Sequence, residues 1–95
     1  MTTRPQARPE TQIDNARTTV TVWRFAPHAE TGWHRHEYDY VIVPQTDGEL
    51  LLEAKDGTET ASLTAGKCYF RSAGVEHNVV NAGSEELVFV EIEIK

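Results

Sequence analysis

Three histidines are the residues of this sequence whose type and spacing best suit chemistry. His34 and His36 stand two residues apart in TGWHRHEYDY, and His77 follows much later in RSAGVEHNVVN. A spacing of two places both imidazoles on one face of a β-strand. His77 can join them only if another strand lies alongside, and neutral imidazole is the commonest metal ligand. The pattern therefore predicts a three-histidine metal site inside a cavity.

The stretches that must position these histidines are short runs of β-branched and aromatic residues separated by turn residues. From Ala16 onward they amount to roughly seven or eight strands at a spacing of about eight to twelve residues, which is typical of an all-β sandwich or barrel. Asp56-Gly57 predicts a tight hairpin. The final run, ELVFVEIEI, alternates with Glu91 and Glu93 opposite Val90 and Ile92. No stretch has the pattern of an amphipathic helix, so we expect a single antiparallel β-barrel.

The chain length favours one domain. A chain of 95 residues is near the usual size of a single domain, and two domains would each bury too little apolar surface. Residues 1–12 hold Pro5 and Pro9 among polar residues without apolar periodicity. We expect them to form a flexible N-terminal arm that could order against a partner subunit, with the barrel domain covering residues 13–95.

The charge balance limits the partners. The net charge is −6, from 9 basic and 15 acidic residues, which argues against nucleic acid and against an anionic membrane surface. No apolar run approaches the length of a bilayer span. Cys68 is the single cysteine and cannot form an internal disulfide, so the sequence favours a reducing, cytoplasmic location.

The two histidine segments resemble the two motifs of the cupin superfamily. That resemblance implies an all-β fold, a single-domain jelly-roll β-barrel (double-stranded β-helix) of antiparallel strands, with a metal in its mouth. It extends over roughly Ile13 to Lys95, nearly the whole domain. The residues that match the second motif are Gly66, Ser72-Ala73-Gly74, His77 and Asn81, and those that match the first are His34, His36 and Gly48.

The sequence departs from the superfamily pattern at one ligand position, and two stretches resemble a narrower group. The glutamate ligand of the superfamily would fall at Tyr40 or Val41, and neither residue is a carboxylate. The stretch WRFAPHAETGWHRHEYDYVIVP and the ending FVEIEIK resemble a narrower group of short cupins assigned to β-alanine degradation. The first motif is therefore expected to supply two histidines without its usual carboxylate.

The predicted metal site holds three histidines and water. Such a donor set suits one divalent transition metal per chain (Zn, Fe, Ni, Cu or Mn) better than the harder Mg or Ca. Tyr40 shares the strand parity of His34 and His36 and is the candidate catalytic residue, either as a phenolate ligand or as a hydrogen-bond partner of bound water. A tyrosine that simply lines the barrel is the alternative.

Four other residues are candidates around the metal. Arg24 and Arg71 lie within apolar runs, and either could bind a substrate carboxylate or form a salt bridge on the barrel surface. Tyr38 has the same parity as Tyr40 and is a candidate substrate-binding residue, with core packing as the alternative. Asn81 could support the ring of a ligating histidine.

These expectations leave two classes of function open. The first is a metal-dependent enzyme, of dioxygenase, isomerase or lyase type, that acts on a small carboxylate-bearing metabolite. The second is a non-catalytic cupin that binds a metal or a small ligand as a sensor or accessory protein. In both cases the partners are a small molecule and a second copy of the chain. A homodimer is expected because the run from Leu87 to Val90 is apolar on both faces.

Overall fold

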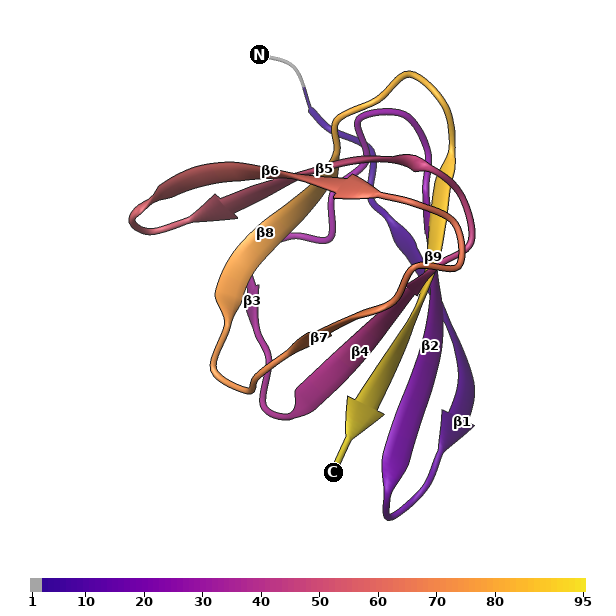
Figure 1. The fold of residues 1–95 in the computed structure, drawn as a ribbon. Coiled ribbons are helices and arrows are strands. Elements are labelled where there is room, and N and C mark those ends of the chain that lie inside the picture. Colours follow the sequence, from indigo (N-terminus) through magenta and orange to yellow (C-terminus); the bar gives the residue numbers. More distant parts are fainter. Residues whose placement is uncertain (1–2) are drawn as a thin grey trace.

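The computed structural model describes residues 3–95, and in this range the chain forms nine β-strands and no helix (Figure 1). The predicted all-β fold is therefore confirmed, and the described residues contain no helix that could span a membrane. The strands are β1 (Arg8–Asp14), β2 (Thr18–Phe25), β3 (His34–Arg35), β4 (Asp39–Pro44), β5 (Gly48–Ala54), β6 (Gly57–Leu63), β7 (Tyr69–Arg71), β8 (Glu76–Asn81) and β9 (Leu87–Ile94).

Two sheets enclose the interior of the molecule. One has the strand order β1-β2-β9-β4-β7 and the other β3-β8-β5-β6, and the named strands pair antiparallel throughout. The C-terminal strand β9 lies between β2 and β4, while β3 lies beside β8 (Figure 1). The fold thus brings the early histidine segment next to the late one, as the sequence predicted.

The space between the sheets is filled by side chains at alternate strand positions. Phe25, Ile42, Leu50 and Leu87 are fully buried there. In β4 the alternation is regular, because Tyr40, Ile42 and Pro44 are buried while the intervening valines are only half-buried. This period of two lets one face of each strand build the core. It also places Tyr40 on the same side as the core residues.

Strand β9 turns its glutamates toward the interior. Leu87, Phe89 and Glu91 share one face, and Glu91 is only 9 % exposed. The predicted alternation of apolar and acidic residues is present. However, the face with Val90, Ile92 and Ile94 is the outward one, since it carries the more exposed side chains. Burying a carboxylate costs free energy unless the group is paired or protonated.

The N-terminal segment differs from the flexible arm expected over residues 1–12. Residues 8–12 belong to β1, which pairs with β2 along the edge of the five-stranded sheet. Pro9 is compatible with this strand because an edge strand leaves one side of its backbone unpaired. Ala7 is buried, and its backbone N–H donates to the Glu30 carbonyl at 2.8 Å. Residues 1 and 2 lie outside the described range.

Strands β5 and β6 form the hairpin that the sequence predicted, displaced by one residue. Ala54 pairs with Gly57, so Lys55 and Asp56 occupy the turn. Gly57 follows them with φ of +139°, a conformation that favours glycine. The glycine of the Asp-Gly pair therefore opens strand β6 instead of lying within the turn.

Candidate metal centre

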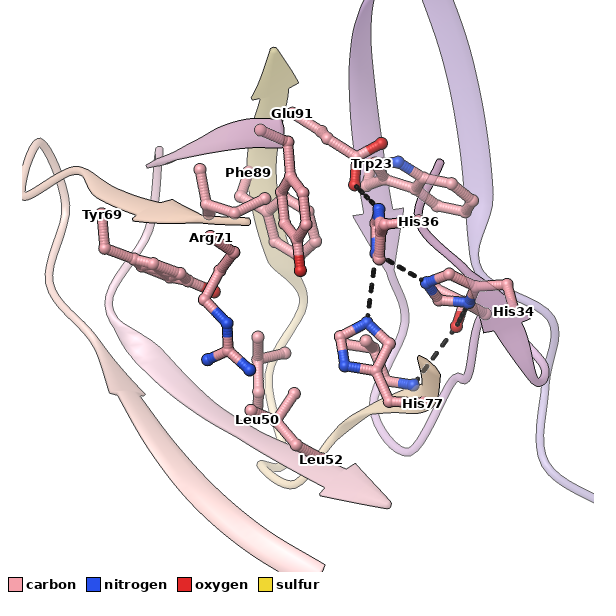
Figure 2. A pocket seen from close by; sticks show the side chains of 14 residues that line it. Trp23, His34, His36, Leu50, Leu52, Tyr69, Arg71, His77, Phe89 and Glu91 are labelled. Carbon is pink, nitrogen blue, oxygen red and sulfur yellow. Dashed lines mark hydrogen bonds and ion pairs between the residues drawn. The ribbon is translucent and has the colours of Figure 1, made fainter. Parts of the chain in front are cut away.

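The three predicted histidines meet on one wall of the interior. His34 in β3 pairs directly with His77 in β8, and His36 follows β3 with its ring on the same side. Their Nε2 atoms converge, with 3.0 Å between His34 and His36 and 3.2 Å between His36 and His77 (Figure 2). Two nitrogens bound to one ion at about 2.1 Å lie roughly 3.0–3.4 Å apart for octahedral to tetrahedral angles. Two of the three distances therefore match a metal-ligand set, and the ligand atoms of all three histidines lie within 4.8 Å of one another.

The backbone orients the ring of His34. Its Nδ1 lies 2.9 Å from the Gly32 carbonyl oxygen and 3.2 Å from the Thr31 hydroxyl. A carbonyl oxygen can only accept, so Nδ1 carries the proton and donates it to Gly32. The lone pair of the neutral ring is then on Nε2, which faces His36. This is the tautomer that a metal ligand needs.

Burial keeps the other two imidazoles neutral. Burial first, and then the nearby charges of His34, His77 and Arg71, together lower the pKa of His36 to about 3. The pKa of His77 is lowered to about 4, again mainly by burial, with smaller effects of His34 and Arg71. At neutral pH neither ring holds a second proton, so a cation would have no proton to displace from them.

Tyr40 packs directly against the histidine cluster. Its ring stacks on His36 with centroids 3.9 Å apart and an interplanar angle of 18°, and it is almost fully buried. Burial raises the pKa of Tyr40 to about 12, so the hydroxyl stays protonated at neutral pH. The structure thus places the predicted catalytic candidate in the cavity as a neutral phenol. Val41, the other position considered for a carboxylate, is half-buried on the opposite side of β4.

The structure separates the two candidate arginines. Arg71 in β7 lines the same cavity as the histidines, across from them (Figure 2). Arg24 lies on the outer side of β2, where its Nε is 2.9 Å from the Glu10 carboxylate. Arg24 therefore forms the surface salt bridge that was its alternative. Among residues 3–95, no carboxylate lies within ion-pair distance of Arg71.

Tyr38 and Asn81 lie away from the inner cavity. Tyr38 is exposed and lines an outer opening that also reaches His34 and His36. Asn81 is buried, and its amide donates to the carbonyls of Phe25, Ala26 and Glu85. These bonds hold the loop before β9 instead of a histidine ring. The expectation that Asn81 supports a ligating histidine is therefore not met, because its side chain is fully committed to backbone groups.

The cavity beside the histidines is small, and a wider space shares part of its lining. The inner space has a volume of about 30 Å³, enough for a water-sized group. A second space of about 420 Å³ adjoins it, and Arg71, His77 and Leu52 line both. A small molecule in the outer space could therefore contact both Arg71 and His77.

Glu91 is the functional residue that sequence reasoning missed. It lines the inner cavity, and its Oε2 lies 3.9 Å from His36 Nδ1 (Figure 2). Burial raises the pKa of Glu91 to about 7, with an added effect of Glu93 and an opposing one of the Trp23 indole. The signal was present in the sequence, because Glu91 shares its parity with Leu87 and Phe89. Parity alone, however, does not decide which face of β9 is inward.

Comparison with known proteins agrees with this geometry. Residues 21–93 match the sequence family described as Cupin domain. The β-alanine degradation protein BauB of Pseudomonas aeruginosa is 64 % identical over 95 residues, the whole of both chains.

Solved structures are similar as well. The crystal structure of a cupin domain from Bordetella pertussis Tohama I has a TM-score of 0.98 at 59 % identity, covering 100 % of this chain and 99 % of that one. A double-stranded β-helix protein from Klebsiella pneumoniae has a TM-score of 0.78 at 21 % identity, covering 99 % and 81 % of the two chains, and shares the fold.

Proposed function

This chain belongs to the cupin domain family, and we propose that it is a metal-dependent enzyme acting on a small carboxylate-bearing metabolite. The observation that carries the proposal is that the Nε2 of His36 lies 3.0 Å from that of His34 and 3.2 Å from that of His77 inside a cavity, with all three ligand atoms within 4.8 Å of one another. His34, His36 and His77 would hold one divalent transition metal.

The donor set determines which ions fit. Three neutral imidazoles suit Zn, Fe, Ni, Cu or Mn better than Mg or Ca, which prefer oxygen ligands. A metal held there would supply Lewis-acid or redox chemistry at the end of the cavity. The charge that it brings would be countered within the inner cavity by Glu91, the only carboxylate that lines this space in residues 3–95.

Arg71 supports a ligand with a carboxylate. Its side chain lines both the inner and the outer space, and no described carboxylate pairs with it. A guanidinium binds a carboxylate through two parallel hydrogen bonds. A ligand held in this way would place its other end toward the histidine cluster. The name of the Pseudomonas relative, which refers to degradation of the amino acid β-alanine, is consistent with such a ligand.

Two tyrosines would complete the ligand site. Tyr40 and Tyr69 both line the inner cavity, and burial raises the pKa of each phenol. Both hydroxyls therefore remain protonated and can donate a hydrogen bond to a bound oxygen or hold a proton beside it. The apolar side chains of Ile42, Leu50 and Phe89 lie around them and limit the access of water.

The second candidate function is a non-catalytic cupin that binds a metal or a small ligand. The observation that favours it is the inner space of only about 30 Å³, beside which the phenol of Tyr40 stays protonated and so cannot act as a base. Turnover of a carboxylate substrate would separate the two candidates. Both require the same metal site.

Metal content is the measurement that tests the proposal. The tag-free protein, dialysed free of loose ions, should contain close to one transition metal per chain by elemental mass spectrometry, or take one up from added Fe(II), Zn, Ni, Cu or Mn. A wild-type protein that neither contains nor binds any of these ions would contradict the proposal.

The carboxylate site is tested with the metal-loaded protein. β-Alanine, propionate and malonate would be titrated calorimetrically against wild type, Arg71→Gln and Arg24→Gln. We expect Arg71→Gln to weaken binding at least tenfold, about 1.4 kcal/mol, while Arg24→Gln binds as wild type. Equal affinities for all three proteins would show that Arg71 does not anchor the carboxylate.

We also propose that the chain is a homodimer, joined through the outward face of the five-stranded sheet. Ile13, Phe70 and Ile94 on this face are each about half exposed, and half-buried valines lie between them. An identical face on a second copy could cover this surface by isologous sheet packing. Light scattering on a sizing column should give twice the chain mass, and Phe70→Glu should give the monomer mass.

A further inference from the structure

Glu91 lies where it can act on a metal ligand without being one. His36 turns its Nε2 toward His34 and His77, so its Nδ1 is on the opposite edge of the ring. That edge faces the Glu91 carboxylate at 3.9 Å, and both side chains are buried, at 7 % and 12 % exposure (Figure 2). Tyr40 covers the face of the same ring. His36 is thus enclosed by one aromatic contact and one acidic contact.

We propose that Glu91 is a positioning residue of the metal centre, whose carboxylate accepts the Nδ1–H of His36 and so directs the Nε2 lone pair at the metal. This inference rests on the proposed function of the histidine cluster as a metal site. It assigns a role to a buried carboxylate that neither the core nor the strand pairing of β9 requires.

The tautomer of His36 is the first argument. A histidine that binds metal through Nε2 must carry its proton on Nδ1, and this N–H normally donates to a carboxylate or a carbonyl. His34 meets this need through Gly32. For His36 the described residues offer Glu91, since no backbone carbonyl is within hydrogen-bond distance of its Nδ1. A movement of about one ångström would convert the ion-pair distance into a charge-assisted hydrogen bond.

The charge around the cluster is the second argument. Glu91 lines both the inner cavity and the outer opening beside His34 and His36, whereas β4 presents Tyr40 there instead of a carboxylate. Arg71 is the one cation that lines the inner cavity within residues 3–95. A divalent ion beside three neutral rings would add positive charge to a buried space, and a carboxylate next to one ring would offset it.

The test compares Glu91 with Glu93. Glu93 is also on β9, two residues away and on the same face, and it lines the outer opening without an ion-pair contact to a histidine. Glu93→Gln therefore removes the same charge nearby without touching His36. Glu91→Gln keeps the size of the side chain, and Glu91→Ala serves as a second variant that removes any acceptor. Far-ultraviolet circular dichroism confirms that each variant is folded.

Co(II) is the probe. Its dissociation constant would be measured by competition with a chelator, together with its visible absorption bands. We expect Glu91→Gln and Glu91→Ala to weaken Co(II) binding about 10- to 100-fold and to shift the bands, while Glu93→Gln changes affinity by less than about threefold. Equal losses for the Glu91 and Glu93 variants would mean that the effect comes from net charge alone, which would overturn the positioning role. An unchanged affinity in Glu91→Ala, which removes any acceptor for the Nδ1–H of His36, would overturn it as well.

A metal-free measurement separates this inference from the proposed function. Nitrogen NMR of the histidine rings at pH 8 should show His36 as the Nδ1–H tautomer in wild type and as Nε2–H in Glu91→Ala. If wild type binds no metal, the proposed function fails, yet this tautomer change would still establish that Glu91 orients His36. If the tautomer is the same in both proteins, Glu91 does not orient the ring and the inference is overturned.

Discussion

His77 and Asn78 are consecutive buried residues of β8, and their side chains lie in two different polar clusters. The side-chain Oδ1 of Asn78 accepts from the Gly32 N–H at 2.9 Å, and its side-chain NH2 donates to Glu30 and Glu53 at 2.8 and 2.9 Å. Arg4 joins the same two carboxylates. His77 instead turns its Nε2 toward His36 Nε2 at 3.2 Å.

The difference shows which polar cluster is complete. The Asn78 network contains donors for its acceptors and one arginine between two carboxylates, so folding alone satisfies it. The histidine cluster is made of three like groups, and at most one N–H can lie between each pair of nitrogens. The remaining nitrogen lone pairs point at one another, and a bound cation would stabilise this arrangement. Removing a residue from each cluster should therefore affect different properties.

The largest effect is expected for His77→Ala. Two histidines cannot complete the metal site, so the metal content should fall from about one ion per chain to near zero. Unfolding of the metal-free protein in urea should change less than for Asn78→Ala, because His77 has one polar contact, to His36, whereas Asn78 has three hydrogen bonds. Elemental mass spectrometry and urea titration check the two parts. A variant that keeps its metal would show that His77 is not a ligand.

Asn78→Ala should show the reverse. The Gly32 N–H loses its acceptor, and Glu30 and Glu53 each lose a donor, which should lower the free energy of unfolding by about 1–3 kcal/mol. The three histidines remain, so the metal content should stay near that of wild type. Urea unfolding of the metal-free protein gives the first value. Loss of metal with unchanged stability would contradict the distinction between the clusters.

The two clusters should also differ in their response to pH. His36 and His77 have folded-state pKa values of about 3 and 4, below the value of about 6.5 for an unfolded histidine. Between these limits the unfolded state binds protons that the folded state does not. Their contribution to stability is therefore fully present above pH 6.5 and is lost as the pH falls toward 4.

Glu91 acts in the opposite sense over part of this range, because its folded-state pKa is raised to about 7. The measurement is therefore a difference between proteins. With chelator present, the free energy of unfolding of wild type should fall more steeply from pH 6.5 to 4.5 than that of His77→Gln. Asn78→Ala should keep the wild-type slope, since it removes no histidine. Parallel curves for wild type and His77→Gln would show that His77 does not contribute.

The sequence predicted those parts of the molecule that depend on local period and spacing. The strand alternation and the spacing of His34 and His36 are visible in a few consecutive residues, and the second motif supplied His77. The residues that it did not resolve depend on which strands become neighbours. Arg24 and Arg71 both follow aromatic or apolar residues, and only the sheet order places Arg71 inside. Glu91 and Asn78 likewise acquire their partners from distant segments, with His36 just after β3 beside Glu91 and Glu53 of β5 beside Asn78.

The smallest effect is expected at the rim of the Asn78 network. Arg4 is half exposed and bridges Glu30 and Glu53, and its guanidinium lowers the pKa of Glu53. Arg4→Gln should shift the urea midpoint only slightly, and less at high salt, since exposed ion pairs contribute little and are screened. Metal content should not change. A shift as large as that of Asn78→Ala would mean that the N-terminal segment, and not the buried amide, holds this network together.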